Sequence, residues 1–199
     1  MRVVVFDWDD TLFCTSQVLH LNAHVALSPT YLSAVRAVLA MSLAVSSDNT
    51  YIVSSSSPGW IEGCVKQFLP DIADLLQKCT IRLVPAAHHG LGERLKEPSF
   101  VSIASECYTS LLVKSHIDFL LIGDMPEDLQ PADTLRSLIP LCSVRTWKMT
   151  KRPSLDELEA SLLSLCNYLA EDLLKMAVSV RSPSSASTGT LGRLDVSSP

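Results

Sequence analysis

The chain lacks a surplus of basic residues. Its 199 residues include 16 Lys and Arg against 21 Asp and Glu, which gives a formal net charge of -5. Nucleic acids and anionic membranes are bound largely by clustered Lys and Arg, so we expect neither as a main partner. A small phosphorylated substrate remains compatible with this charge, because a local pocket and a metal ion can hold it.

Paired cysteines and long apolar segments are also missing. None of the six Cys forms a Cys-x-x-Cys pair, and most lie in apolar stretches, which favours buried free thiols in a reducing compartment. The first apolar run is too short for a signal peptide and ends in acids. The segment 25–45 contains Pro29 and Arg36, and the part after Pro29 is shorter than the roughly 20 residues of a membrane span. We therefore expect a cytoplasmic protein.

Short apolar runs alternate with amphipathic segments along the chain. The runs predict strands at residues 3–6, 51–53, 81–84, 119–122 and 142–147. The amphipathic segments predict helices at residues 29–45, 60–76 with a break at Pro70, 98–114, 131–138 and 154–180. This alternation predicts an α/β fold, with a parallel sheet of about five strands and helices on both faces. We expect residues 1–180 to form one domain and the Ser- and Pro-rich residues 181–199 to be disordered.

Acidic residues follow two of the predicted strands. Asp7, Asp9 and Asp10 come after the first strand, and Asp124 and Asp128 come after the fourth. The carboxyl ends of parallel strands meet at one edge of a sheet, so these residues are expected to converge. Packed carboxylates repel one another unless a cation neutralises them. Oxygen ligands of this kind suit Mg²⁺ best, whereas the alternative is an acidic turn or helix cap.

Four short motifs resemble those of the haloacid dehalogenase (HAD) superfamily. They are Asp-x-Asp-x-Thr at residues 7–11, Ser54 at a strand end, Lys96 at a helix start, and Gly-Asp-x-x-x-Asp at residues 123–128. The resemblance covers roughly residues 1–165 and is closest to uncapped HAD-like proteins. It implies a Rossmann-like core.

The spacing of these motifs leaves no room for a cap domain. Residues between Thr11 and Ser54 carry mainly one helical pattern, and those between Ser54 and Lys96 carry a helix and a strand that the sheet needs. A domain of even about 50 residues does not fit in either interval. An open site suits a phosphoprotein or another bulky phosphoester, although small phosphorylated metabolites remain candidates.

The resemblance implies a Mg²⁺-dependent phosphomonoester hydrolase. Asp7 would attack phosphorus and form an aspartyl-phosphate, and Asp9 would protonate the leaving oxygen and then activate water. Ser54 and Lys96 would hold the phosphoryl group. The metal ligands would be Asp7, Asp9 through its carbonyl, Asp124 and Asp128. Carbon–halogen hydrolysis is disfavoured by Asp9, because a leaving halide needs no proton.

Several alternatives stay open at this point. A catalytically weak HAD-like scaffold or regulatory binding module is the rival to the enzyme. Ser55 and Ser56 compete with Ser54 for the second motif, and Arg94 and Lys114 compete with Lys96 for the third.

Neighbouring residues invite local predictions. Asp10 is expected to have a conformational or capping role, and Thr11 to form a hydrogen bond within its own loop. Trp8 and Trp60 either flank the mouth of the site or brace its loops. The pair at residues 88–89 is expected to lie in a surface loop, and Cys14 is not expected to be a nucleophile, since no His is placed to activate it.

Overall fold

The structure is a computed structural model. It describes residues 1–20, 27–78, 81–88, 94–110 and 116–181. The predicted tail lies almost entirely outside the described residues, as do Lys114, His89 and Gly90.

The centre of the molecule is a five-stranded parallel sheet in the order β3-β2-β1-β6-β7. Its strands are β1 (Arg2–Phe6), β2 (Thr50–Ser54), β3 (Ile81–Pro85), β6 (Ile117–Gly123) and β7 (Cys142–Lys148). The parallel sheet and the five strands predicted from the apolar runs are confirmed, with β1 in the middle. An antiparallel pair of very short strands, β4 (Ala87–His88) and β5 (Arg94–Leu95), was not predicted, because two residues carry no periodic signal.

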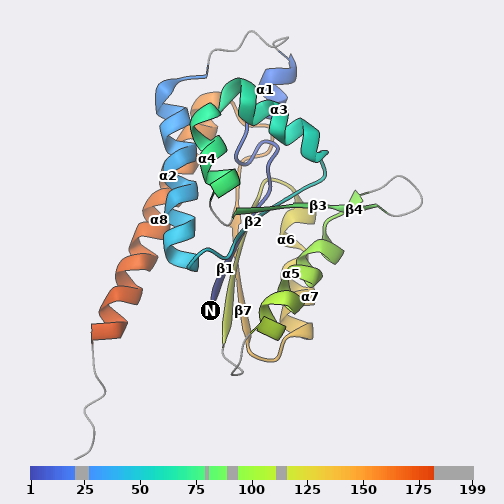
Figure 1. Ribbon diagram of the computed structural model, residues 1–199, viewed down its shortest axis with the longest axis vertical. Helices are drawn as coiled ribbons and strands as arrows, with labels where there is room; N and C mark the ends of the chain where they lie inside the picture. The colour runs from blue at the N-terminus through green and yellow to red at the C-terminus, as the bar shows by residue number, and fades with distance from the viewer. Residues whose placement is uncertain (21–26, 79–80, 89–93, 111–115, 182–199) are drawn as a thin grey trace, which may run out of the picture.

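Helices cover both faces of this sheet (Figure 1). One face carries α2 (Pro29–Ser46), α3 (Pro58–Phe68), α4 (Pro70–Lys78) and α8 (Leu155–Arg181), and the other carries α5 (Glu97–Ser110) and α7 (Pro131–Leu138). Two short helices, α1 (Thr15–His20) and α6 (Pro126–Leu129), follow the acidic motifs and were not predicted.

Local sequence explains where several helices begin. Pro29 and Pro58 occupy the first turn of α2 and α3, where the missing N–H costs nothing. Ser28 and Ser57 accept hydrogen bonds from Tyr31 N (3.1 Å) and Trp60 N (3.2 Å), which caps the two helices. The break expected at Pro70 separates α3 from α4.

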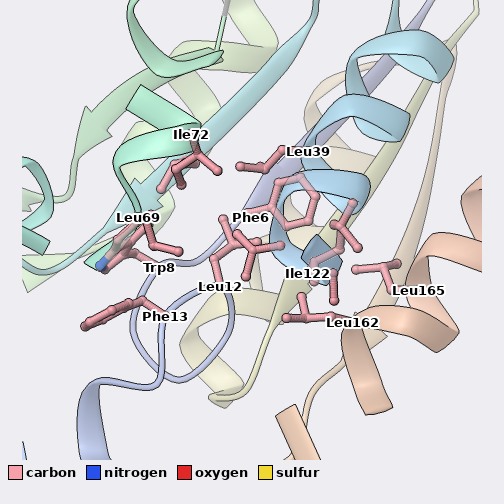
Figure 2. Packing of buried hydrophobic residues seen from close by; sticks show 14 of the residues in the cluster. Phe6, Trp8, Leu12, Phe13, Leu39, Leu69, Ile72, Ile122, Leu162 and Leu165 are labelled. Atoms are coloured by element: carbon pink, nitrogen blue, oxygen red, sulfur yellow. The ribbon is translucent and has the colours of Figure 1, made fainter. Parts of the chain in front are cut away.

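Alternate residues of each central strand enter two different hydrophobic cores. In β1, Val4 and Phe6 face the core beneath α2 and α8, whereas Val3 and Val5 face the core beneath α5 and α7. Figure 2 shows the first core, in which Phe6 and Ile122 lie among side chains from α2, α4 and α8. Burial on both faces holds β1 rigidly, so the residue that follows it has a fixed position.

The helix α2 is long and apolar enough to cross a membrane by length and composition alone. In this fold it packs on α8 and β1 and contributes Val35, Val38 and Leu39 to the core. Packing in the hydrophobic core therefore explains why α2 is as apolar as a membrane-spanning helix.

Candidate functional site

The acidic residues gather at the carboxyl edge of the sheet. Asp7 directly follows β1, and its N–H donates to the carbonyl of Ile122 in β6 at 2.8 Å, so the ends of the two strands are locked together. Asp7, Asp124 and Asp128 are buried, and each offers a carboxylate oxygen within 4.8 Å of the others. The expected convergence of these three residues is thus present.

Lys96 enters this cluster from the start of α5. Its carbonyl accepts hydrogen bonds from Ser99 N (2.9 Å) and Phe100 N (3.2 Å), which fixes its backbone at the first turn of the helix. Its Nζ contacts Asp7 Oδ1 and lies 2.5 Å from Asp128 Oδ1, and the side chain is 6% exposed. The lysine expected from the third motif therefore lies in the site.

A missing side chain at Gly123 makes room for Asp128. A Cβ built on Gly123 would lie 2.3 Å from Asp128 Cβ and 2.4 Å from Asp128 Oδ2, closer than real Cβ contacts. The same Oδ2 accepts a hydrogen bond from Met125 N at 2.9 Å. Gly123 and the backbone of Met125 together fix the second carboxylate of the Gly-Asp-x-x-x-Asp motif.

Burial dominates the electrostatics of this cluster. Loss of water raises the pKa of Asp7 to about 8, since repulsion by Asp128 adds to burial and the attraction of Lys96 only partly opposes them. Burial also raises the pKa of Asp124 to about 6, with further repulsion from Asp128 and Asp10. Burial alone would lower the pKa of Lys96, but attraction to Asp7 and Asp128 leaves it above its ordinary value.

The cluster fits a divalent cation. Three buried carboxyl groups face a single ammonium group, so full ionisation leaves an excess of negative charge. The ammonium group of Lys96 contacts two of the three, Asp7 and Asp128. Oxygens that share an Mg²⁺ ion at about 2 Å lie within roughly 4 Å of one another, which is compatible with this spacing. Asp7, Asp124 and Asp128 are the residues that would hold such an ion.

Asp9 is held by four donors beside the cluster. Its Oδ1 accepts from Thr15 Oγ1 (2.6 Å) and Trp60 Nε1 (3.2 Å). Its Oδ2 accepts from Ser56 Oγ (2.7 Å) and Ser54 Oγ (3.2 Å). Trp60 therefore braces a loop of the site through its indole N–H, one of the two roles expected for it.

Two serines that end and follow β2, Ser54 and Ser55, lie in different surroundings. The Ser54 hydroxyl is buried, donates to Asp9 and accepts from Ser56 N at 2.9 Å. Ser55, one of the open alternatives for the second motif, lines the pocket over Asp7. The strand-end rule, by which residues that follow neighbouring parallel strands lie at one edge of the sheet, located this serine segment. It did not distinguish these two hydroxyls.

The loop of the first motif agrees in part with the local predictions. Asp10 has φ 55°, and its carboxylate accepts from Ser16 N (2.8 Å) and contacts Ser16 Oγ, so it adopts a left-handed turn and caps α1 as expected. Thr11 forms a hydrogen bond within its loop through its backbone, because its N–H donates to the carbonyl of Trp8 at 3.4 Å. Its buried hydroxyl has no hydrogen-bond partner among the described residues. Backbone donors already take the nearby Trp8 carbonyl, with Leu12 N at 3.0 Å and Phe13 N at 2.9 Å.

Two further side chains near this loop belong to the core. Trp8 is fully buried and its ring stacks on Phe13, with the ring centroids 5.7 Å apart, so it does not flank the mouth. Burial raises the pKa of the Cys14 thiol to about 11, which opposes a role as a nucleophile. The five cysteines in the described part of the chain are free thiols.

A pocket of about 290 Å³ opens over the cluster. Asp7, Asp9, Asp10, Lys96 and Asp124 line it. Four further lining residues were not anticipated: Met125, Glu127, Lys151 and Arg152. Lys151 and Arg152 follow β7, so the strand-end rule applied to the fifth strand would have found them.

Comparisons with protein-family models, curated proteins and solved structures give no match to this chain.

Proposed function

We propose that this chain is an uncapped HAD-type phosphohydrolase that transfers the phosphoryl group of a phosphomonoester to Asp7 and then to water. The observation that carries the proposal is the contact of Lys96 with both Asp7 and Asp128, beside Asp124. Lys96, Asp7, Asp124 and Asp128 come from three separate positions of the chain, and all four are buried. Lys96, Asp7 and Asp124 line one pocket. A purely structural cap or turn does not require such a convergence.

Each residue has a defined task in this mechanism. A carboxylate oxygen of Asp7 attacks phosphorus, the bond to the leaving oxygen breaks, and Asp9 gives that oxygen a proton. Asp9 then takes a proton from a water molecule, which attacks the phosphorus and releases Asp7 and inorganic phosphate. Lys96 offsets negative charge on Asp7 and on the phosphoryl oxygens. The serine segment after β2 provides donors for those oxygens, with Ser55 in the pocket lining, whereas the Ser54 hydroxyl is donated to Asp9 in this structure.

A divalent ion such as Mg²⁺ would supply the remaining positive charge when bound. Asp7, Asp124 and Asp128 would hold it, together with the backbone carbonyl of Asp9 that the family resemblance implies. The raised pKa of Asp7 explains why a cation matters for this chain: a nucleophilic carboxylate must be ionised, and burial opposes that.

The elements between the motif residues bear on the substrate. The described residues between β1 and β2 form α1 and α2, and those between β2 and Lys96 form α3, α4, β3 and the β4–β5 pair. None of these elements forms a separate domain over the pocket. The open pocket supports a bulky phosphoester, such as a phosphoprotein, as a candidate substrate.

A second candidate function is a binding module with weak or no turnover. The hydrogen bonding of Asp9 favours this candidate. Each carboxylate oxygen of Asp9 accepts from two donors, which leaves no free site for the proton that a general acid must carry. Catalysis requires at least one of these donors to turn away.

Hydrolysis of a generic aryl phosphate, with Mg²⁺ and with EDTA, tests the proposed function. We expect turnover that requires Mg²⁺ and falls by orders of magnitude in Asp7→Asn, because the covalent intermediate can no longer form. A matched control is Asp71→Asn, which alters an exposed carboxylate in the first turn of α4. Undiminished turnover in Asp7→Asn would remove Asp7 as the nucleophile, and absent turnover in the wild type would favour the binding module.

A further inference from the structure

Two cations at the rim of the pocket have no task in the proposed reaction. Lys151 and Arg152 are exposed and line the pocket that contains Asp7 and Asp124. Neither forms an ion pair with another residue in the described ranges. Lys96, the third cation of the pocket, is already engaged with Asp7 and Asp128.

The segment that presents these cations is fixed at both ends. It connects β7 to α8 and begins at Met149, whose N–H donates to the carbonyl of Gly123 at 2.8 Å and whose side chain is buried. It ends at the buried Pro153 and at Ser154, which accepts a hydrogen bond from Glu157 N at 3.3 Å. Lys151 and Arg152 therefore project from a short segment tied to the end of β6.

The backbone at Arg152 is strained. Its φ of 49° lies in the left-handed region, where a residue with a long side chain is unfavourable and Gly would be relaxed. Strain of this kind persists where the surrounding structure imposes it, and it gathers at functional sites. Here the strained residue carries a guanidinium group at the rim of the candidate active site.

The charges of the pocket indicate what the rim would bind. Apart from Lys96, Lys151 and Arg152, the charged lining residues are acids: Asp7, Asp9, Asp10, Asp124 and Glu127. In the proposed reaction Lys96, beside Asp7, is the side-chain cation that meets the phosphoryl group. Lys151 and Arg152 at the rim are then available to contact the leaving group of the substrate. A guanidinium beside an ammonium suits a carboxylate or a phosphate, because both accept charge-assisted hydrogen bonds.

We infer that Lys151 and Arg152 bind a second anionic group, a carboxylate or a phosphate, on the leaving group of the phosphomonoester. The inference rests on the proposed function. It narrows the substrate class to phosphomonoesters with a second negative charge within reach of the rim.

Three aryl esters test the inference. In meta-carboxyphenyl phosphate and meta-carbamoylphenyl phosphate, a carboxylate is exchanged for a neutral group of nearly the same shape, and meta-phenylene bisphosphate provides a second phosphate. We expect the wild type, with Mg²⁺, to show a kcat/KM about tenfold higher for the carboxylate or the bisphosphate than for the amide, as one charge-assisted contact provides. The ester whose kcat/KM exceeds that of the amide by the larger factor shows whether the rim binds a carboxylate or a phosphate.

Substitution of the rim separates this contact from a general effect of charge. In the double variant Lys151→Gln with Arg152→Gln, we expect the preference over the amide to fall about tenfold, towards unity. Arg36→Gln removes an exposed cation on α2, away from the pocket lining, and should keep the wild-type ratio. If the double variant loses kcat/KM equally for all three esters, Lys151 and Arg152 change only the electrostatic potential of the pocket, which overturns the inference.

The outcomes also separate this inference from the proposed function. If the wild type hydrolyses the three esters with the same kcat/KM, the second anion is not recognised, and the phosphohydrolase remains. If the wild type hydrolyses none of them although Mg²⁺ binds, the proposed function fails and the inference fails with it.

Discussion

Lys96 Nζ lies 2.5 Å from Asp128 Oδ1 and also contacts Asp7 Oδ1, so one buried ammonium group joins the first acidic motif to the last. Removal of a partner from a buried ion pair leaves an uncompensated charge, which typically costs about 3–5 kcal/mol. We therefore expect Lys96→Met to lower the free energy of unfolding by about 3 kcal/mol in urea with EDTA. The loss should be smaller in Mg²⁺, if the cation binds the same carboxylates.

A matched control for this prediction is Lys66→Met, which alters an exposed lysine of α3. Its effect should stay within about 0.5 kcal/mol, as for most surface substitutions. If Lys96→Met costs no more than the control, the contact with Asp7 and Asp128 does not stabilise the fold.

The raised pKa of Asp7 predicts how the metal-free protein responds to pH. Burial in the folded protein raises the pKa of this carboxyl group from its ordinary value of 3.8 to about 8, so between these pH values the folded state holds more protons than the unfolded state. Stability must then fall as the pH rises, since proton binding favours the folded state. We expect the free energy of unfolding, measured in EDTA, to be lower at about pH 8 than at about pH 6.

Asp7→Asn provides the comparison, because an amide does not titrate. Its unfolding free energy should decrease less over the same pH interval than that of the wild type. An equal or larger decrease in Asp7→Asn would place the responsible group elsewhere.

The close approach of Gly123 to Asp128 predicts an effect of a single methyl group. In Gly123→Ala the new Cβ would meet Asp128 Cβ at 2.3 Å, so Asp128 has to move away from Lys96 and from Met125 N. We expect a destabilisation of about 1–3 kcal/mol, as for other overpacked sites, together with weaker Mg²⁺ binding by calorimetry.

Gly59→Ala is the matched control, because a Cβ at Gly59 meets no atom within 4 Å. It lies in the first turn of α3, where Ala is tolerated. Unchanged Mg²⁺ affinity in Gly123→Ala would show that Asp128 does not depend on this space.

The strand-end rule explains what the sequence could predict. Apolar runs locate strands that are buried on both faces, and residues that follow neighbouring parallel strands share an edge, as Asp7 and Asp124 do. Elements of two to six residues, such as α1, α6 and the β4–β5 pair, are too short to show a period. The orientation of the Ser54 hydroxyl depends on its distance from Asp9, which no local pattern encodes.

The contact of Trp60 with Asp9 predicts a kinetic effect that depends on the leaving group. Trp60→Phe keeps the ring but removes the indole N–H that holds Asp9 Oδ1 at 3.2 Å. If Asp9 is the general acid, an alkyl phosphate, whose leaving oxygen needs a proton, should lose about tenfold in kcat. An activated aryl phosphate should lose less.

Trp147→Phe is a control of the same kind, because Trp147 packs on Tyr168, with ring centroids 5.0 Å apart, and does not line the pocket. Equal losses for the alkyl and aryl esters in Trp60→Phe would indicate a general disturbance of the site rather than a displaced acid.

Beryllium fluoride distinguishes the enzyme from the binding module without knowledge of the substrate. It mimics a phosphoryl group on an aspartate, and on Asp7 it would need a divalent cation and Lys96 to balance its charge. A ligand present at about 100 times its Kd stabilises the folded state by about 2.7 kcal/mol, which corresponds to a rise in Tm of roughly 5–10 °C for a chain of this size. We expect this rise with Mg²⁺ and beryllium fluoride together, and not with either alone. It should vanish in Asp7→Asn, shrink in Lys96→Ala and persist in Lys66→Ala. If Mg²⁺ binds by calorimetry and the joint rise is absent from the wild type, Asp7 does not accept a phosphoryl group, and the binding module becomes the better account.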